Sequence, residues 1–313
     1  MKDVRAAVVG VGALGQHHAR VYASLAGCRL CGVYDVDPAR ARAVAERHGA
    51  PVQERLRDVI ETADVVSVAV PTVDHHRVAK ALIEAGKHVL LEKPIAASLE
   101  EADDLIRVAA QRGVTLQVGH IERFNPATEV LLAASTRPRF IEVHRLGSFS
   151  ARSLDIDVVL DLMIHDLDIV LALDGSEPVQ VDAVGVPVLT PRVDIANARL
   201  RFASGLIANL TASRVSAEKV RKFRVFLPRT YISVDFAARE AQVYRLREGP
   251  AGPDIAVERT AAPDEEPLRR QIEAFLAAAR DGTEPIVSGR DGRRALALAQ
   301  RIIQEMTSAA DAG

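Results

Sequence analysis

Three side chains of this sequence have the chemistry needed to take a proton from a hydroxyl group: Lys93, Asp161 and His165. Lys93 follows the apolar run 89–91 and Glu92, and it stands directly before a proline. An apolar segment between two helical patterns is typical of a parallel strand covered on both faces, where charges occur only at strand ends. We therefore expect Lys93 at the carboxyl edge of a parallel sheet, where ligands bind. A solvated lysine at a strand end is the alternative interpretation.

Asp161 and His165 lie in the pattern 158–170, which is apolar apart from its acids and this histidine. At 100° per residue, Asp161, His165 and Asp168 share one narrow face of a helix. A helix this apolar is buried, so its polar stripe must face a partner or a cavity. A histidine between two carboxylates has the composition of an oriented general base. The alternatives are a core histidine with satisfied hydrogen bonds and a metal pair that lacks visible further ligands.

A glycine-rich turn near the start of the chain indicates a dinucleotide site. The apolar segment 4–9 leads into a GxGxxG sequence and then into a helical pattern. Its glycines allow the tight turn, the approach of backbone to a pyrophosphate, and close packing of helix on strand. The residues expected to bind the cofactor here are Gly10, Gly12, Ala13, Leu14 and Gly15.

Asp35 ends the second predicted strand, twenty residues beyond the last of these glycines. An acid at this position accepts hydrogen bonds from the adenosine ribose and repels a 2′-phosphate. The cofactor is therefore predicted to be NAD, while Arg40 and Arg42 leave NADP possible.

Other polar residues are expected at the same sheet edge. Pro71 and Thr72 follow the third predicted strand, and Glu92 and Lys93 follow the fourth, where the cofactor would cross the sheet. Beyond the fifth strand come Arg123 and Asn125 as expected substrate ligands. Arg123 has the geometry to clamp a carboxylate or a diphosphate, or else to form a salt bridge between domains. Asn125 precedes a proline and is also expected to cap a helix.

Size and composition limit the classes of protein. The chain has 313 residues, enough for two domains, with 48% hydrophobic and 26% charged residues. A net charge of -2 argues against nucleic acid or an anionic membrane as partner. No apolar run is long enough to span a bilayer, and the first residues lack a signal-peptide pattern. We expect a cytoplasmic protein, with Cys28 and Cys31 reduced and structural.

The order of predicted elements gives the fold class. Strands and helices alternate through residues 1–121, which predicts an α/β Rossmann domain with a doubly wound parallel sheet. Residues 122–313 are predicted as an α+β domain with a large, mainly antiparallel open sheet, from six strand patterns between 140 and 236. Because few helices are available to cover such a sheet, we expect a homodimer or homotetramer formed through its free face.

Taken together, the motifs resemble one family. The glycine turn 10–15, the segment 85–94 and the Asp161-x-x-x-His165 pattern are similar to the glucose–fructose oxidoreductase, inositol dehydrogenase and rhizopine-catabolism family. The resemblance implies that Lys93, Asp161 and His165 form the catalytic group. His165 would be the base and Lys93 the donor to the reacting oxygen, although the two could exchange roles, and Asp161 would orient the substrate or the histidine. The sequence departs from the family in having Asp157 and Val158 where two glycines often precede the helix.

The resemblance implies NAD-dependent oxidation of a ring hydroxyl in a sugar or sugar nucleotide, with no metal. Residues 119–126 and 157–166 are most similar to members that oxidise C3 of UDP-N-acetylglucosamine for lipopolysaccharide synthesis. An inositol-type polyol or free-sugar dehydrogenase is the competing enzyme. A dinucleotide-sensing regulator without catalysis is the competing class, and retention of all three catalytic residue types argues against it.

Overall fold

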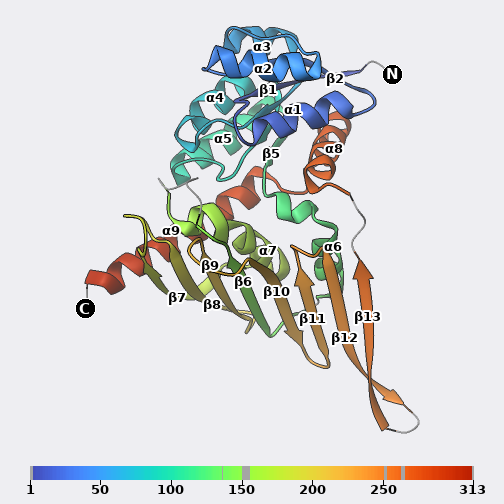
Figure 1. The fold of residues 1–313 in the computed structure, drawn as a ribbon, viewed down its shortest axis with the longest axis vertical. Coiled ribbons are helices and arrows are strands. Elements are labelled where there is room, and N and C mark those ends of the chain that lie inside the picture. The colour runs from blue at the N-terminus through green and yellow to red at the C-terminus, as the bar shows by residue number, and fades with distance from the viewer. Residues whose placement is uncertain (1–2, 136, 150–155, 250–251, 262–264, 312–313) are drawn as a thin grey trace. The chain divides into compact units, whose positions relative to one another are not determined.

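The structure, a computed structural model, describes residues 3–135, 137–149, 156–249, 252–261 and 265–311. Two compact units divide the chain. Unit 1 comprises Met1–Ile121 and Glu266–Arg293, and unit 2 comprises Glu122–Glu265 and Arg294–Gly313 (Figure 1). The chain therefore leaves unit 1 after Ile121, returns to unit 1 at Glu266, and passes into unit 2 again at Arg294.

The described part of unit 1 contains a five-stranded parallel sheet in the order β2-β1-β3-β4-β5. The strands are β1 (Val4–Val9), β2 (Cys28–Tyr34), β3 (Val65–Val68), β4 (His88–Leu91) and β5 (Leu116–Val118). Strands β3 and β4 are buried along nearly their whole length, as expected for strands covered on both faces. The predicted doubly wound Rossmann architecture is confirmed.

Helices connect these strands, and local sequence sets where they begin and end. They are α1 (Gly15–Ser24), α2 (Pro38–His48), α3 (Leu56–Thr62), α4 (Thr72–Glu84) and α5 (Leu99–Arg112). The Asp37 side chain accepts from two backbone amides at the start of α2, and Ser98 does so once for α5. Gly113 ends α5 with a φ of 64°, a conformation that glycine adopts without strain.

Helix α8 (Pro267–Asp281) belongs to unit 1, together with the residues up to Arg293. This differs from the expected division, which put all of residues 122–313 in the second domain. The physical reason is packing, because Ile272 and Phe275 of α8 are fully buried in the same apolar cluster as Val8 of β1. Helix α9 (Gly289–Asp311) contains the third boundary along the chain, between Arg293 and Arg294.

The described part of unit 2 contains an eight-stranded sheet in the order β13-β12-β11-β10-β6-β9-β8-β7. Its strands are β6 (Phe140–Leu146), β7 (Pro178–Val186), β8 (Ile195–Phe202), β9 (Ile207–Ser213), β10 (Val220–Leu227), β11 (Thr230–Asp235), β12 (Glu240–Gly249) and β13 (Gly252–Ala261). Neighbouring strands are antiparallel except β6 and β9, which are parallel. The predicted open, mainly antiparallel sheet is confirmed.

The expectation of six strands was wrong, because β12 and β13 form a further hairpin at one edge. Much of this hairpin is exposed, including Leu246, Ile255 and Val257. Its sequence is rich in charged residues and lacks the clean alternation of apolar and polar residues on which the prediction relied. Burial on one face produces that alternation, so an exposed hairpin does not show it.

One face of this sheet carries the core of unit 2. It is covered by α6 (Pro126–Ala134), α7 (Ile164–Asp174) and the part of α9 that begins at Arg294. A short 3-10 helix, η1 (Ile121–Phe124), precedes α6, and a π-helical turn, η2 (Val159–Met163), precedes α7. The predicted helix 158–170 is therefore not uniformly α-helical. Because a π-turn holds more residues than an α-turn, the stripe calculated at 100° per residue does not hold through it.

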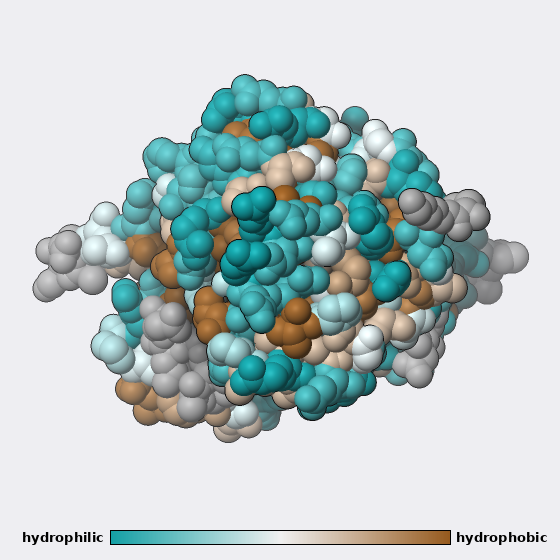
Figure 2. All heavy atoms as spheres, turned by 90° about the horizontal axis from the view of Figure 1, so that it is seen from above, coloured by the Kyte–Doolittle hydropathy of each residue, from teal (hydrophilic) through white to brown (hydrophobic). Residues whose placement is uncertain are grey.

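The surface of unit 1 over α2 and α3 is largely hydrophilic, as Figure 2 shows from that side. Arg40, Arg42, Glu46 and Arg47 of α2 are all exposed. Among the described residues, no helix combines the length and the apolar character needed to cross a membrane.

Candidate active site

The glycine turn of unit 1 has the backbone geometry of a dinucleotide site. Gly10 has a φ of 82°, and a Cβ added to it would lie 2.7 Å from the carbonyl oxygen of Ala69. A Cβ on Gly15 would lie 1.8 Å from the carbonyl oxygen of Gly10, so both positions require glycine. Gly12 differs, because a Cβ there would meet nothing within 4 Å. Open space above Gly12, at the start of α1, fits the close approach of a pyrophosphate.

Asp35 and a cavity of about 480 Å³ lie beside this turn. The Asp35 carboxylate accepts from the backbone amide of Val11 at 2.8 Å and from Arg40 Nη1 at 3.2 Å. Gly12, Ala13, Arg40 and other residues of α1 and α2 line the cavity. The carboxylate thus pairs with Arg40, one of the two arginines that left NADP possible, which is the arrangement expected for NAD. The residues present fit that cofactor.

Lys93 stands where the sequence predicted, just after β4 at the carboxyl edge of the parallel sheet. It is half-buried, and its peptide bond to Pro94 is cis. Pro71 and Thr72 follow the adjacent strand β3 and open α4. Leu14, at the start of α1, is 48% exposed, and Ala13 is exposed as well, whereas Gly10 and Gly15 are buried. The expected cofactor residues of unit 1 therefore all lie at strand ends on one edge of the sheet.

A group of buried polar side chains lies next to Lys93, and we call it the lysine cluster. Its members are Tyr22, Ser67, His18, Glu92 and His75. His18 Nε2 is 3.0 Å from Glu92 Oε1, His18 Nδ1 is 3.0 Å from Ser67 Oγ, and Ser67 Oγ is 2.9 Å from the Tyr22 hydroxyl. The second oxygen of Glu92 accepts from the backbone amide of Lys93 at 3.3 Å.

The Glu92 carboxylate fixes one hydrogen position in this chain. Burial raises the pKa of Glu92, but the bond from His18 and the charge of Lys93 outweigh it, so the pKa lies below its usual range. The ionised carboxylate only accepts, so His18 Nε2 must donate. With the ring hydrogen on Nε2 only, Nδ1 accepts from Ser67, and Ser67 in turn accepts from the Tyr22 hydroxyl. We assign this arrangement, which satisfies every member of the chain.

His75 completes the lysine cluster from α4. Its Nδ1 is 2.8 Å from the carbonyl oxygen of Pro94, and its Nε2 is 3.0 Å from the carbonyl oxygen of Val70. His75 is only 1% exposed. It links the residue after Lys93 to the end of β3.

In unit 2, Asp161 lies in η2 and His165 in the first turn of α7, and both are half-buried. The Nδ1 atom of His165 is buried. Apolar neighbours on these helices, including Met163 and Ile164, are fully buried in the core of unit 2. Asp168, predicted on the same stripe, is only 2% exposed. Asp161 and His165 are therefore partly exposed whereas Asp168 is buried. A difference in burial along the predicted stripe is expected when a π-turn interrupts the helix.

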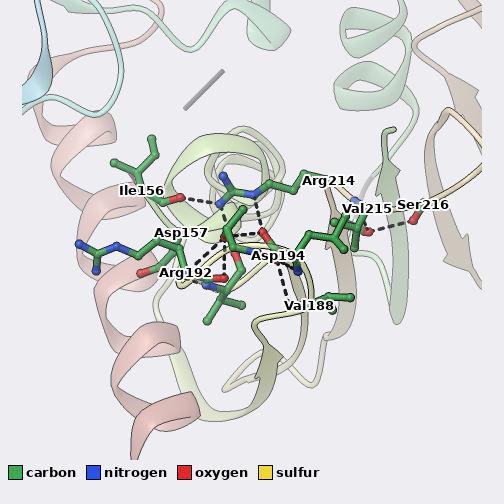
Figure 3. Close-up of polar contacts among 12 residues, drawn as sticks. Ile156, Asp157, Val188, Arg192, Asp194, Arg214, Val215 and Ser216 are labelled. Carbon is green, nitrogen blue, oxygen red and sulfur yellow. Dashed lines mark hydrogen bonds and ion pairs between the residues drawn. The ribbon is translucent and has the colours of Figure 1, made fainter. Parts of the chain in front are cut away.

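Hydrogen bonds to the turn that precedes β8 fix the start of this helix (Figure 3). Asp157 Oδ1 accepts from the Val193 amide at 3.1 Å, and the Val193 carbonyl accepts from the Val158 amide at 3.1 Å. Arg214 donates to the carbonyls of Ile156 and Val193. Asp157 and Val158, which replace the glycines common in the family, thus tie the helix start to a neighbouring turn.

Asp194 organises that turn, as Figure 3 shows in part. One of its oxygens accepts from the amides of Val188, Leu189 and Thr190 at 2.6–2.9 Å. Burial raises the pKa of Asp194, but these bonds outweigh it and lower the pKa to about 2. Arg214 Nε lies 3.5 Å from the other oxygen of Asp194. Both residues are buried, so this ion pair is buried as well.

A second buried group, which we call the arginine cluster, consists of Glu122, Arg145 and Asp166. Arg145 donates to both oxygens of Asp166 at 2.7 Å and to Glu122 Oε1 at 3.0 Å. Burial alone would lower the pKa of Arg145, but the two carboxylates raise it, so the guanidinium stays charged. Asp166 follows His165 directly in the chain, so this cluster ties the proposed base to strand β6.

Arg123 and Asn125, the expected substrate ligands, have partners within unit 2. Arg123 Nη1 lies 3.4 Å from each oxygen of Asp168. The Asn125 side chain accepts from the Ala127 amide, which makes it the predicted cap of α6, and donates to Glu122. Their roles toward a substrate stay predictions. So does the meeting of Lys93 with Asp161 and His165, because they belong to different units.

The fold and the glycine turn define a two-domain oxidoreductase with an NAD-binding Rossmann domain. Residues 4–120 match the model of the oxidoreductase family with an NAD-binding Rossmann fold, and residues 131–232 match the C-terminal domain of the same family. The chain belongs to this family, known as GFO/IDH/MocA, and it is an NAD-dependent dehydrogenase.

Two curated relatives cover nearly the whole chain. UDP-N-acetylglucosamine 3-dehydrogenase of Acidithiobacillus ferrooxidans is 40% identical over 305 residues, which is 96% of this chain and 97% of the relative. Inositol 2-dehydrogenase of Rhizobium meliloti is 28% identical, and the match covers 97% of each chain. A solved structure of the Acidithiobacillus enzyme has a TM-score of 0.92 and 39% identity, over 98% of this chain and 99% of that one.

Proposed function

We propose that this protein oxidises the C3 hydroxyl of UDP-N-acetylglucosamine to the 3-keto sugar nucleotide, with NAD as the oxidant. The observation that carries the proposal is the 40% identity to the Acidithiobacillus enzyme over 96% of the chain. The match to inositol 2-dehydrogenase is equally long but only 28% identical. The proposed catalytic residues belong to both units, and the match to the Acidithiobacillus enzyme spans both.

In this proposal the residues divide the proton chemistry. NAD, when bound, supplies the hydride acceptor. His165 takes the hydroxyl proton, and because its Nδ1 is buried we assign this step to Nε2. Lys93 donates a hydrogen bond to the reacting oxygen and stabilises the negative charge that develops there. Asp161 orients the sugar or the imidazole, while Arg123 and Asn125 complete the substrate site.

Substrate oxidation with NAD tests this directly. Purified protein is mixed with UDP-N-acetylglucosamine, UDP-glucose, free N-acetylglucosamine or myo-inositol, and the reduced cofactor is followed by absorbance. The product is then trapped with borodeuteride, and the labelled carbon is located by NMR. We expect turnover of the first substrate with deuterium at C3. Turnover of myo-inositol alone would instead establish an inositol-type dehydrogenase, and cofactor binding without any turnover would favour a regulator.

We further propose that the keto product is the substrate of an aminotransferase in lipopolysaccharide synthesis, and that both reactions occur in the cytoplasm. A keto group on a sugar nucleotide is the functional group that an amine donor requires. Cys28 and Cys31 are free thiols, as expected in a reducing compartment.

The free face of the unit 2 sheet supports a homo-oligomer. Phe140, Phe226, Tyr231 and Tyr244 stand side by side on four adjacent strands, with ring centroids 4.9–5.5 Å apart. They alternate with core residues such as Val225 and Ile232, so they lie on the face away from the core. We propose that a second copy of the chain covers this row. Sedimentation at micromolar concentration should show a dimer or tetramer, and a stable monomer would contradict the proposal.

A further inference from the structure

The residues on both sides of Lys93 are held by buried histidines from two different helices. On one side, His18 of α1 contacts the carboxylate of Glu92 at 3.0 Å. On the other side, His75 of α4 contacts the carbonyl of Pro94 at 2.8 Å. His18 and His75 are 2% and 1% exposed, whereas Lys93 itself is half-buried. The backbone that carries the lysine is therefore fixed by side chains that do not face solvent.

We propose that His18 and His75 are positioning residues for Lys93, acting through the Glu92 carboxylate and the Pro94 carbonyl. The inference rests on the proposed function, in which Lys93 holds the reacting oxygen. A flexible four-carbon side chain is precise only if its own backbone is fixed. A displacement of about 1 Å in a catalytic group can cost about a hundredfold in rate.

A ring nitrogen of His75 forms a hydrogen bond to its carbonyl partner only if that nitrogen carries a hydrogen. Both partners are carbonyl oxygens, which only accept, so both bonds together require the protonated ring. Burial lowers the pKa of His75, against the effect of those carbonyls and of nearby Glu92. A neutral ring has one hydrogen, and the shorter contact assigns it to Nδ1, which faces Pro94.

Two amide substitutions separate the contacts of His75. The amide nitrogen of asparagine comes close to the place of Nδ1, and that of glutamine comes close to the place of Nε2. His75→Asn therefore keeps the donor toward Pro94, whereas His75→Gln keeps only the donor toward Val70. We expect kcat of His75→Asn to stay within about threefold of wild type and that of His75→Gln to fall by about 10- to 100-fold. Their Tm values and NAD dissociation constants should match each other.

His18 allows the same comparison. Its Nε2 faces Glu92, so His18→Gln retains a donor to the carboxylate and His18→Leu does not. We expect His18→Gln to restore most of the kcat that His18→Leu loses. The control pairs are His17→Gln with His17→Leu and His76→Asn with His76→Gln. His17 is exposed on the same helix as His18, and His76 pairs with Asp104 at the surface of α4. Within each control pair, the two variants should have the same kcat.

A readout without cofactor or substrate completes the test. Backbone hydrogen exchange of Lys93, Ile95 and Ala96 in the cofactor-free protein should be faster in His75→Gln than in His75→Asn. Equal kcat and equal exchange in the two variants would overturn the inference. If the wild type oxidises none of the sugars, the proposed function fails and hydrogen exchange alone decides the positioning role. Should both His75 variants fail to fold, the His18 pair decides it.

Discussion

The lysine cluster of unit 1 and the arginine cluster of unit 2 each adjoin a proposed catalytic residue, but they are built from different charges. In the lysine cluster, donors surround one carboxylate, and in the arrangement that we assign the hydrogen bonds run in one direction from Tyr22 to Glu92. In the arginine cluster, a guanidinium is buried between the carboxylates of Glu122 and Asp166. The hydrogen bonds of the lysine cluster depend on which atoms carry hydrogens. The stability of the arginine cluster depends on the neutralisation of its buried charges.

The difference predicts how each cluster responds to substitution. A neutral donor can be replaced by an amide of suitable length without leaving a buried charge. A buried ion pair cannot lose one member in this way, because the remaining charges stay uncompensated in a poorly solvated place. Changes in the lysine cluster should therefore affect mainly turnover, while changes in the arginine cluster should affect mainly stability.

The largest effect should come from the catalytic residues themselves. His165→Ala should reduce turnover by about two to four orders of magnitude, as for a lost general base, and Lys93→Ala should reduce it at least comparably. NAD affinity should hardly change, because the glycine turn and Asp35 are untouched. Steady-state kinetics and cofactor titration check this, with His17→Ala as the control. Wild-type turnover in either variant would contradict the proposed mechanism.

Arg145→Met should lower the free energy of unfolding by about 3–5 kcal/mol, because it leaves two buried carboxylates without their cation. The matched control is Arg224→Met. Arg224 pairs with Glu142 across neighbouring strands at 2.6 Å, but its side chain is 30% exposed, so its loss should cost at most about 1 kcal/mol. Denaturant unfolding compares them. An equal decrease in the free energy of unfolding in the two variants would mean that burial of the arginine cluster does not make its ion pairs more important for stability than an exposed pair.

Much of the chemistry at the sheet edge was predictable, because it depends on local patterns. Gly10, Asp35 and Lys93 each follow a short apolar strand, and the carboxyl ends of parallel strands meet at one edge. The helix of His165 was recognisable from its apolar content alone. The alignment of Asp161, His165 and Asp168 on one face was not predictable, because η2 is a π-turn that the sequence pattern does not reveal.

The supporting residues were missed for a different reason. His18 contacts Ser67 and Glu92, which are 49 and 74 residues away in the sequence, and His75 contacts the carbonyl of Pro94, which is 19 residues away. A signal was nevertheless present in α4. His75 precedes Val78, Ala79 and Leu82 by three, four and seven residues, so it lies on the buried face of the helix. The place of α8 in unit 1 had no local signal, since it depends on tertiary packing.

Acid should destabilise unit 2 through Asp194. Its pKa of about 2 in the folded chain is below the usual value near 3.8, so the unfolded chain binds a proton more readily at low pH. The stabilisation is complete above about pH 4 and is lost as the pH falls toward 2. In Asp194→Asn this loss between pH 4 and 2 should be smaller. Thermal unfolding against pH checks it, with exposed Asp182→Asn as the control, and an unchanged acid limb would refute the assignment.

The smallest effect should come from the far end of the lysine cluster. Tyr22→Phe removes the hydroxyl that donates to Ser67 but leaves His18 and Glu92 with their bonds, so stability should fall by about 1 kcal/mol. Tyr34→Phe is the control, because among the described residues Tyr34 has no side-chain hydrogen bond. Chemical denaturation measures both. A hydroxyl at the end of a one-way chain should matter less than the donor next to the carboxylate, so Tyr22→Phe should also keep more turnover than His18→Leu. The reverse order would favour the other arrangement, in which His18 is protonated and donates to both Glu92 and Ser67.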